Sequence, residues 1–322
     1  MVTRALPATE PVDFAALVRE GLSRPGQKEL PSKFFYDEAG SALFDQISLL
    51  PEYGLTRAEE RILSHHASDI VNNLPQPLAV AELGSGTGKK TRILLEALCR
   101  RHTLSYYPIE ISPSALATCE RELKDIHCIS IVGLEREYLA GLQEVAARRR
   151  VGQHLLVLFL GSTIGNFDGE AGTHFLRELR GVLREGDFLL LGADLEKPVP
   201  TLLAAYDDSQ GVTAAFNRNL LARINRELGG NFLLDQFAHE VIFNEGTRSV
   251  EMHLRSRRQQ VVSVPGADLV VKFARGETIW TETCHKYVFH ELRALADDSG
   301  FLPVGAWFDS AWGFVDNLWV AA

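Results

Sequence analysis

The segment that most constrains this chain runs from Ala79 to Gly88 and reads AVAELGSGTG. A short apolar run ends at an acidic residue, three glycines follow at alternate positions, and a helical pattern begins at Lys90. A strand, a tight turn and a helix start in this order form the place where an α/β sheet binds a nucleotide-like ligand. Glycine suits the turn because it has no Cβ to obstruct the backbone or the ligand.

The spacing of the glycines excludes two common phosphate-binding motifs. G-x-G-x-G differs from the dinucleotide motif G-x-G-x-x-G. The P-loop pattern fails because Leu83 stands in place of its first glycine and Lys90 in place of the Ser or Thr that holds magnesium. The remaining pattern resembles the first motif of S-adenosylmethionine (SAM) dependent methyltransferases, E/D-x-G-x-G-x-G. A purely structural glycine turn remains the alternative.

The composition indicates a soluble globular protein of 322 residues, with 46% apolar and 23% charged residues. This length suffices for one large domain or two ordinary ones. The formal net charge of −9 argues against a broad surface for nucleic acid or anionic membranes. No apolar run approaches the roughly 20 residues of a membrane helix, and residues 1–13 lack the apolar core of a secretion signal. We therefore expect a cytoplasmic protein.

The four cysteines form no C-x-x-C pair, and none of the ten histidines belongs to an H-E-x-x-H motif. We expect neither a disulfide framework nor a metal site. Reduced thiols in a cytosolic protein are the simplest interpretation.

Strand and helix patterns alternate from about residue 78 to residue 195, which predicts a parallel sheet with helices on both sides. Pro198 and Pro200 then break the chain, and the following helical and strand-like stretches indicate an inserted α+β region. The first 60 residues have no place in the predicted sheet, so we expect them to pack with that insert. We expect strands over residues 78–82, 104–110, 126–132, 154–160 and 187–192, and helices over 90–98, 113–123, 138–148, 169–183 and 286–296.

Further segments carry a more specific resemblance. They are FFYDEAGSALFD (34–45), LPEYGLTR (50–57), LGSTIGN (160–166), AYDDSQGVTAAFNRN (205–219) and TETC (281–284). Together with the glycine motif, these segments resemble the histidine Nα-methyltransferases of ergothioneine biosynthesis, from about Leu30 to the end of the chain.

The resemblance implies an α/β fold with a Rossmann-like SAM-binding methyltransferase domain and a second, α+β domain that binds the substrate. We place the first domain at residues 61–196 and 285–322, and the second at residues 1–60 and 197–284. The implied reaction is three successive methylations of the α-amino group of free L-histidine, with hercynine as the product. We expect a monomer.

Several residues near the glycine motif are expected to contact SAM. Glu110 closes the second strand, where an acid can accept hydrogen bonds from both ribose hydroxyls. The family has an acidic residue for adenine after Gly133, whereas this chain has Leu134 and then Glu135. Either Glu135 substitutes in a shifted loop, or stacking and backbone contacts hold adenine. The resemblance adds Gly84, Gly86, Lys90 and Gly161 to the cofactor site.

The resemblance places Asn166 and Tyr206 on the carboxylate of the amino acid. Asn166 follows a predicted strand at the carboxyl edge of the sheet, where ligands bind in open α/β folds. From the residues alone, a turn residue and a packed core tyrosine are the ordinary interpretations. Tyr36, Phe44 and Tyr53 resemble the aromatic wall near the amino group. Tyr36 or Tyr53 could relay a proton through water, so both are candidate catalytic residues.

The imidazole ring is the point at which the sequence departs from its family. The resemblance implies that Glu282 accepts a hydrogen bond from the imidazole N–H and that Met252 faces the same ring. Position 284 is Ser in the family and Cys284 in this chain, and a thiol is a weak donor and a weak acceptor.

The sequence is compatible with two other functions. A sibling enzyme could methylate another aromatic amino acid, such as tryptophan or a prenylated tryptophan, because Glu282 could equally accept an indole N–H. A catalytically inactive protein that only senses SAM is the other alternative, and Leu134 is the one feature that favours it.

Overall fold

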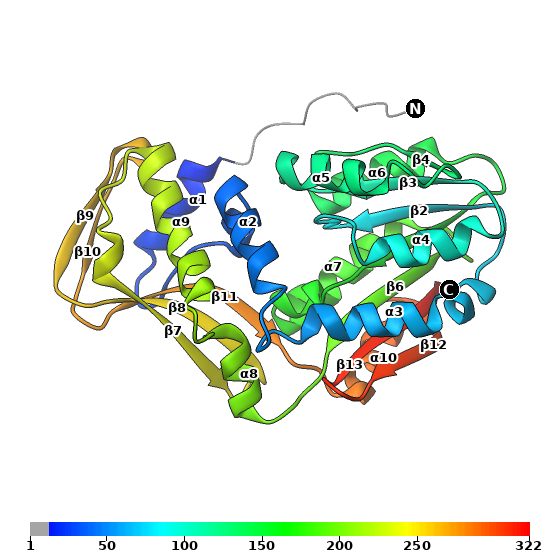
Figure 1. Cartoon of the computed structure of the whole chain (residues 1–322). Coiled ribbons are helices and arrows are strands. Elements are labelled where there is room, and N and C mark those ends of the chain that lie inside the picture. The colour runs from blue at the N-terminus through cyan, green and yellow to red at the C-terminus, as the bar shows by residue number, and fades with distance from the viewer. Residues whose placement is uncertain (1–12) are drawn as a thin grey trace. The chain divides into compact units, whose positions relative to one another are not determined.

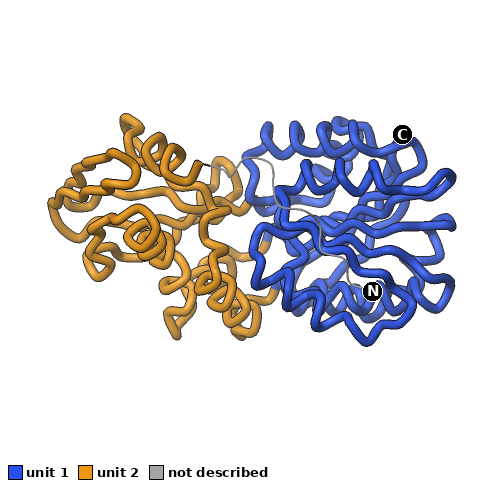
Figure 2. Tube along the Cα trace, turned by 90° about the horizontal axis from the view of Figure 1, so that it is seen from above, with its two compact units in different colours: residues 1–8, 55–196, 285–322 blue, residues 9–54, 197–284 orange. Residues whose placement is uncertain are grey.

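The computed structural model in Figure 1 describes residues 13–322, so the assignment of residues 1–12 to the substrate domain lies outside the described residues. The chain forms two compact units, which Figure 2 colours separately. The first unit comprises Leu55–Glu196 and His285–Ala322. The second unit runs to Gly54 and continues over Lys197–Cys284. Helix α3 begins at Leu55, so residues 55–60 belong to the first unit rather than to the second, where the sequence boundaries placed them.

The first unit contains a seven-stranded sheet in the order β12-β13-β6-β5-β2-β3-β4. The five strands from β6 to β4 are parallel, as the alternating pattern predicts, whereas β13 is antiparallel to β6 and β12 is antiparallel to β13. The strands are β2 (Leu78–Leu83), β3 (Leu104–Ile109), β4 (Ile129–Ile131), β5 (His154–Phe159), β6 (Phe188–Asp194), β12 (Phe301–Asp309) and β13 (Phe314–Ala321). The helices are α3 (Leu55–Asn72), α4 (Thr91–Cys99), α5 (Pro113–Leu123), α6 (Tyr138–Arg148), α7 (Gly169–Val182) and α10 (Phe289–Asp298), with a short 3₁₀ helix η2 (Thr163–Asn166).

The centre of this sheet is apolar because it is covered on both faces. Every residue of β2 and of β6 is buried. Helices α6, α7 and α10 share one apolar core with the sheet, to which Leu142, Leu176 and Leu292 contribute. The buried central strands provide the rigid frame that presents the loops at their carboxyl ends.

The second unit contains a four-stranded sheet in the order β1-β11-β8-β7 and a two-stranded sheet of β9 and β10. Strand β1 is parallel to β11, which joins the N-terminal segment to the 197–284 segment. The strands are β1 (Lys28–Glu29), β7 (Phe237–Asn244), β8 (Ser249–Ser256), β9 (Gln260–Val264), β10 (Leu269–Phe273) and β11 (Thr278–His285). The helices are α1 (Phe14–Ser23), α2 (Glu38–Ile47), α8 (Val199–Tyr206) and α9 (Val212–Leu228), with 3₁₀ turns η1 (Ser32–Phe35), η3 (Leu234–Gln236) and η4 (Pro265–Ala267).

The helix expected from Lys286 begins instead at Phe289. Lys286 is fully buried, and its ammonium lies 3.0 Å from the carboxylate of Asp194, which is fully buried as well. Tyr287 forms an isolated parallel bridge with Leu195. The residues before α10 are therefore held in an extended conformation by partners nearly a hundred residues away, which a helical pattern cannot reveal.

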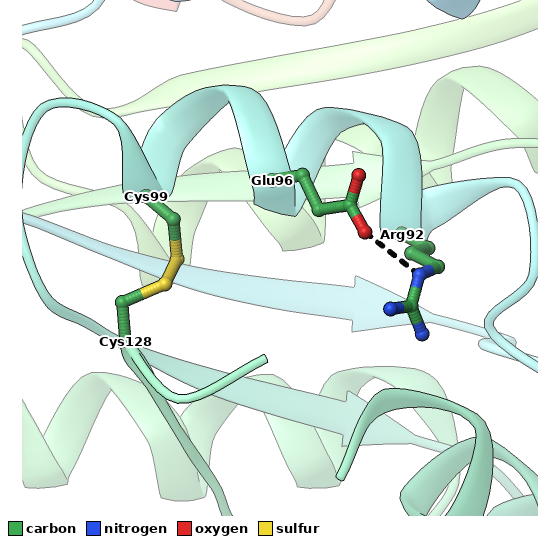
Figure 3. The surroundings of a disulfide bond; sticks show 4 residues. All are labelled: Arg92, Glu96, Cys99 and Cys128. Carbon is green, nitrogen blue, oxygen red and sulfur yellow. Dashed lines mark hydrogen bonds and ion pairs between the residues drawn. A yellow bond between two sulfur atoms is a disulfide. The ribbon is translucent and has the colours of Figure 1, made fainter. Parts of the chain in front are cut away.

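The expectation of reduced thiols is wrong for two of the four cysteines. Cys99 and Cys128 form a disulfide with a Cα–Cα distance of 5.8 Å, shown in Figure 3 near the ion pair of Arg92 and Glu96. It joins the end of α4 to the segment that leads into β4. The two cysteines are 29 residues apart, and only the tertiary fold brings the end of α4 to the segment before β4. Cys119 and Cys284 are free and buried.

Glu82, the acidic residue of the glycine motif, is a structural residue of the first unit. Its carboxylate is buried and accepts hydrogen bonds from the hydroxyls of Thr91, at 2.6 Å, and Tyr106. Burial raises the pKa of Glu82 to about 7, although both hydrogen bonds act to lower it.

Among residues 13–322, no helix combines the length and the apolar content needed to cross a membrane.

The raised pKa of Glu82 predicts a pH-dependent stability. Because the pKa in the folded state lies above the ordinary value of 4.5, the stabilising contribution is complete below pH 4.5 and is lost as the pH rises through about 7. We expect the free energy of unfolding of wild type, relative to Glu82→Gln, to fall by about 3 kcal/mol between pH 4.5 and pH 8. Urea titrations across this range measure the difference. Glu185→Gln, which removes an exposed carboxylate, is the control, and a pH-independent difference for Glu82→Gln would contradict the prediction.

Candidate functional site

The three glycines of the motif have different structural roles. All three have positive φ angles, 72° at Gly84, 51° at Gly86 and 72° at Gly88. A Cβ at Gly88 would lie 2.7 Å from the sulfur of Cys119, so this glycine is required by packing. No atom lies within 4 Å of a Cβ built at Gly86. The backbone at Gly86 therefore has the open approach that a cofactor such as SAM needs.

Glu110 lies directly after β3 and faces the glycine loop. Its carboxylate accepts the N–H of Gly86 at 3.1 Å and the N–H of Ser112 at 3.0 Å. Burial raises the pKa of Glu110, and the backbone N–H groups oppose this rise without cancelling it. An acidic side chain held beside the glycine loop fits the predicted role in binding a ribose.

The two candidates for adenine differ in exposure. The side chain of Leu134 is fully buried in the apolar core. Its backbone pairs with Pro108 of β3, at 2.9 Å, and with Glu110 directly after β3, at 3.0 Å. Glu135 is exposed. Leu134 thus fixes the loop, whereas the exposed carboxylate of Glu135 is accessible to a ligand. Their contacts with adenine remain predictions.

Lys90 and Gly161 meet at a residue that the sequence did not single out. Glu59 of α3 is fully buried, accepts the N–H of Gly161 at 2.7 Å and forms an ion pair with Lys90. Burial acts to lower the pKa of Lys90, but the carboxylate of Glu59 raises it above its ordinary value. Lys90 is therefore charged, and its ion pair with Glu59 links the start of α4 to the loop after β5. No sequence pattern distinguishes Glu59 from its neighbour Glu60.

Tyr138 is a second residue that sequence reasoning missed. It is the first residue of α6, and its hydroxyl lies 3.1 Å from the position that a Cβ at Gly84 would occupy. The side chain of Tyr138 thus lies against the glycine loop at Gly84. Its only signal in the sequence is its place at a helix start.

Asn166 ends the short helix η2, which follows β5 at the carboxyl edge of the sheet. The turn before η2 is tight, with φ angles of 75° at Gly161 and 60° at Ser162. The hydroxyl of Ser162 accepts the N–H of Asp194 at 2.9 Å, which fastens this turn to the end of β6. Asn166 therefore lies at the edge where the sequence placed it. It belongs to the first unit, and its relation to the substrate residues of the second unit remains a prediction.

The second unit brings four of the predicted residues into one aromatic cluster. The ring centroids are 5.7 Å apart for Tyr36 and Phe44, 6.3 Å for Phe44 and Tyr53, and 6.2 Å for Tyr53 and Tyr206. Phe216 of α9 extends the cluster, with its ring 5.8 Å from Tyr36 and 6.0 Å from Phe44. Phe216 stands inside a motif that the resemblance used, but its role emerges only from the packing of α9.

The remaining predicted residues lie on two neighbouring strands of the same unit. Glu282 and Cys284 are close to the end of β11, and the backbone carbonyl of Glu282 accepts the indole N–H of Trp280 at 2.8 Å. Met252 lies on β8, where its carbonyl is 3.0 Å from the hydroxyl of Thr281. Within residues 13–322, no group of three His, Cys, Asp or Glu residues is arranged to hold a metal ion.

The contrast between two glycines predicts a selective loss of cofactor binding. Gly86→Val should abolish SAM binding because its side chain fills the open approach, and the positive φ angle should cost only about 1–2 kcal/mol of stability. Gly88→Ala should destabilise the fold instead, since its Cβ overlaps Cys119. Calorimetric titration with SAM and thermal unfolding separate the two effects. Normal SAM affinity in folded Gly86→Val would contradict this role.

The comparisons with known proteins agree with these features. Residues 14–321 match the family described as "Histidine-specific methyltransferase, SAM-dependent". The histidine N-alpha-methyltransferase of Mycolicibacterium smegmatis is 41% identical over 302 residues, covering 92% of this chain and 91% of the relative. The enzyme of the same name from Mycobacterium tuberculosis is 42% identical, with coverage of 89% and 88%.

More distant similarities extend to other methyltransferases. The L-tryptophan methyltransferase of Psilocybe serbica is 27% identical and covers 91% of this chain and 89% of its own. The solved structure of the 1,6-didemethyltoxoflavin-N1-methyltransferase of Burkholderia thailandensis has a TM-score of 0.40 at 11% identity, with 88% of each chain covered. The match over nearly the whole chain and the identity above 40% show that this chain belongs to the family of SAM-dependent, histidine-specific methyltransferases.

Proposed function

We propose that this enzyme transfers methyl groups from SAM to the α-amino group of free L-histidine, three in succession, to give hercynine for ergothioneine biosynthesis. The observation that carries this proposal is the aromatic cluster of Tyr36, Phe44, Tyr53 and Tyr206 in a chain of this family. The product has a quaternary nitrogen, and aromatic faces stabilise such a cation.

The residues of the first unit fit a SAM site. SAM supplies an electrophilic methyl group on its sulfonium. The backbone at Gly86 leaves room for the cofactor, Glu110 is placed to hold the ribose, and Lys90 offers a cation beside the loop. Gly84 and Gly161 complete the predicted contacts, with Leu134 and Glu135 in the adenine loop. These residues bind and orient the cofactor.

The task of the protein toward the amino acid is orientation and proton removal. A nitrogen must offer a lone pair to accept a methyl group, so the ammonium form must first lose a proton. Alignment of the reacting groups can supply much of the rate enhancement. The hydroxyls of Tyr36 and Tyr53 are the candidates for passing the proton to water, and both belong to the aromatic cluster.

The alternative substrate is another aromatic amino acid, because the relative from Psilocybe serbica is named an L-tryptophan methyltransferase. A buried cysteine stands at position 284, where the family has serine, so other aromatic amino acids are tested alongside histidine.

The net charge of −9 argues against nucleic acid as a partner. We also propose a cytoplasmic monomer, although a disulfide such as Cys99–Cys128 is rare in that compartment.

A methylation assay over all free aromatic amino acids, with the product mass recorded, tests the proposal. We expect L-histidine to be the best substrate and to gain three methyl groups. Tryptophan or tyrosine as the best substrate would replace histidine by the sibling function, and SAM binding without any methylated product would support a SAM sensor.

Asn166 and Tyr206 are expected to bind the carboxylate of the amino acid. Asn166→Ala and Tyr206→Phe should each raise the KM for histidine by about tenfold to a hundredfold, because each loses a hydrogen bond to a charged group. The affinity for SAM should stay near that of wild type. Steady-state kinetics and SAM titrations measure both quantities, and an unchanged KM in both variants would place the carboxylate elsewhere.

Glu282 is expected to dominate the selection of the imidazole ring. A charged acceptor makes a stronger hydrogen bond than a thiol does. Glu282→Ala should therefore reduce kcat/KM for histidine far more than Cys284→Ala, and Cys284→Ser should maintain or improve it. Met252, on the neighbouring strand, is expected to contact the same ring. A measured preference of wild type for tryptophan that shifts toward histidine in Cys284→Ser would identify Cys284 as a change of specificity.

A further inference from the structure

A chain of hydrogen bonds crosses the second unit, and its side chains His239, Asn217 and Thr281 have no role in the function described above. The imidazole Nε2 of His239, on β7, lies 2.8 Å from the backbone carbonyl oxygen of Tyr206. The other ring nitrogen, Nδ1, lies 2.9 Å from the amide Nδ2 of Asn217, on α9. His239 therefore joins the end of α8 to α9.

The surroundings of Asn217 determine which of these atoms donate. The amide nitrogen lies 3.1 Å from the carbonyl oxygen of His253, and the amide oxygen lies 2.8 Å from the hydroxyl of Thr281. Because a carbonyl can only accept, the end of the amide that faces His253 is the NH₂ group. The same NH₂ group faces Nδ1 of His239, so Nδ1 must accept and the proton of the ring must be on Nε2.

The resulting state of His239 is a neutral imidazole that donates from Nε2 to Tyr206. Burial lowers the pKa of His239, which agrees with a neutral ring. The charged groups around it are the carboxylates of Asp207 and Asp208 and the guanidinium of Arg218. A second proton, on Nδ1, would point at the NH₂ group of Asn217 and break that contact.

The carbonyl of Tyr206 needs an external donor. Tyr206 is the last residue of α8, and the last four carbonyls of a helix have no partner within the helix. His239 supplies this donor from a neighbouring strand. The bond fixes the backbone of the residue whose side chain packs against Tyr53 and is proposed to contact the substrate carboxylate.

The far end of the chain of hydrogen bonds reaches the strands that carry the other proposed substrate residues. The hydroxyl of Thr281 is 2.8 Å from the amide oxygen of Asn217 and 3.0 Å from the carbonyl oxygen of Met252. Thr281 directly precedes Glu282 on β11. The same few side chains thus connect Tyr206 to the neighbours of Glu282 and to Met252.

We propose that His239 and Asn217 are positioning residues for amino-acid binding: neutral His239 holds the end of α8 so that Tyr206 is in place, and Asn217 sets the tautomer of His239. The proposal rests on the proposed function, which gives Tyr206 its contact with the substrate. It predicts that these residues affect the KM for the amino acid rather than cofactor binding.

Three substitutions of His239 separate positioning from simple packing. His239→Gln keeps an N–H donor that can reach the carbonyl of Tyr206. His239→Asn keeps an acceptor near Asn217 but is too short to reach Tyr206, and His239→Phe keeps only the ring. His174→Gln is the matched control, because His174 is exposed on α7.

The expected readout is a split between the kinetic parameters. His239→Asn and His239→Phe should raise the KM for histidine about tenfold, the scale of one lost hydrogen bond. His239→Gln should stay within about threefold of wild type. The dissociation constant of S-adenosylhomocysteine, and kcat per cofactor-binding site, should change less than about twofold in all of them. An equal KM in the three variants, or a KM that changes only together with cofactor affinity, would overturn the proposal.

The tautomer is tested without substrate by nitrogen NMR of the ¹⁵N-histidine-labelled protein, with His239 assigned by its loss in His239→Gln. Wild type should show a proton on Nε2 and none on Nδ1, whereas Asn217→Asp should show protons on both, because a carboxylate would then accept from Nδ1. A proton on Nδ1 of wild type would overturn the inference. If the assay identifies another amino acid as the substrate, the KM comparison is made with that amino acid, so failure of the proposed substrate is distinguished from failure of the positioning role.

Discussion

The predicted cofactor site depends on the contacts of one buried carboxylate, that of Glu59. An unpaired charge at a fully buried position would be costly. Glu59 avoids this cost because it forms an ion pair with the ammonium of Lys90 and accepts a hydrogen bond from the N–H of Gly161. Asp316 lies in the same buried region, where burial and then the charge of Glu59 raise its pKa well above the ordinary value. The charge of Lys90 acts in the opposite direction on Asp316, so the three side chains are linked electrostatically. One side chain of α3 thereby fastens the start of α4 to the turn that leads to Asn166.

Local patterns in the sequence were sufficient for most of the first unit. The apolar runs of β2, β5 and β6 are long because both faces of the sheet are covered. The Ser112 cap and the proline after it fixed the start of α5, where the serine hydroxyl accepts a backbone N–H as expected. These signals are carried by adjacent residues, so the sequence predicted the elements and the position of the glycine loop.

The parts that the sequence did not reveal depend on partners far along the chain. Lys286 fits a helical pattern, but its ion pair with Asp194 holds it in an extended segment. Cys99 and Cys128 carry no spacing signal, and Phe216 joins the aromatic cluster only because α9 packs beside it. The roles of Glu59 and His239 likewise arise from contacts across 102 and 33 residues. Such contacts follow from the tertiary fold, which single-residue patterns do not encode.

The division of the chain into two units has a consequence for specificity. The residues around the glycine loop belong to the first unit, and none of them needs to distinguish one amino acid from another. Relatives named for histidine and for tryptophan both align with more than 85% of this chain, so a difference in substrate need not alter the fold. Met252, Glu282 and Cys284 all lie on strands of the second unit. In such a sheet a substitution changes one side chain while the backbone hydrogen bonds persist. For example, the indole N–H of Trp280 donates to the backbone carbonyl at position 282, whichever side chain that position carries. If these proposed substrate residues select the amino acid, specificity can evolve at them without loss of the predicted cofactor site.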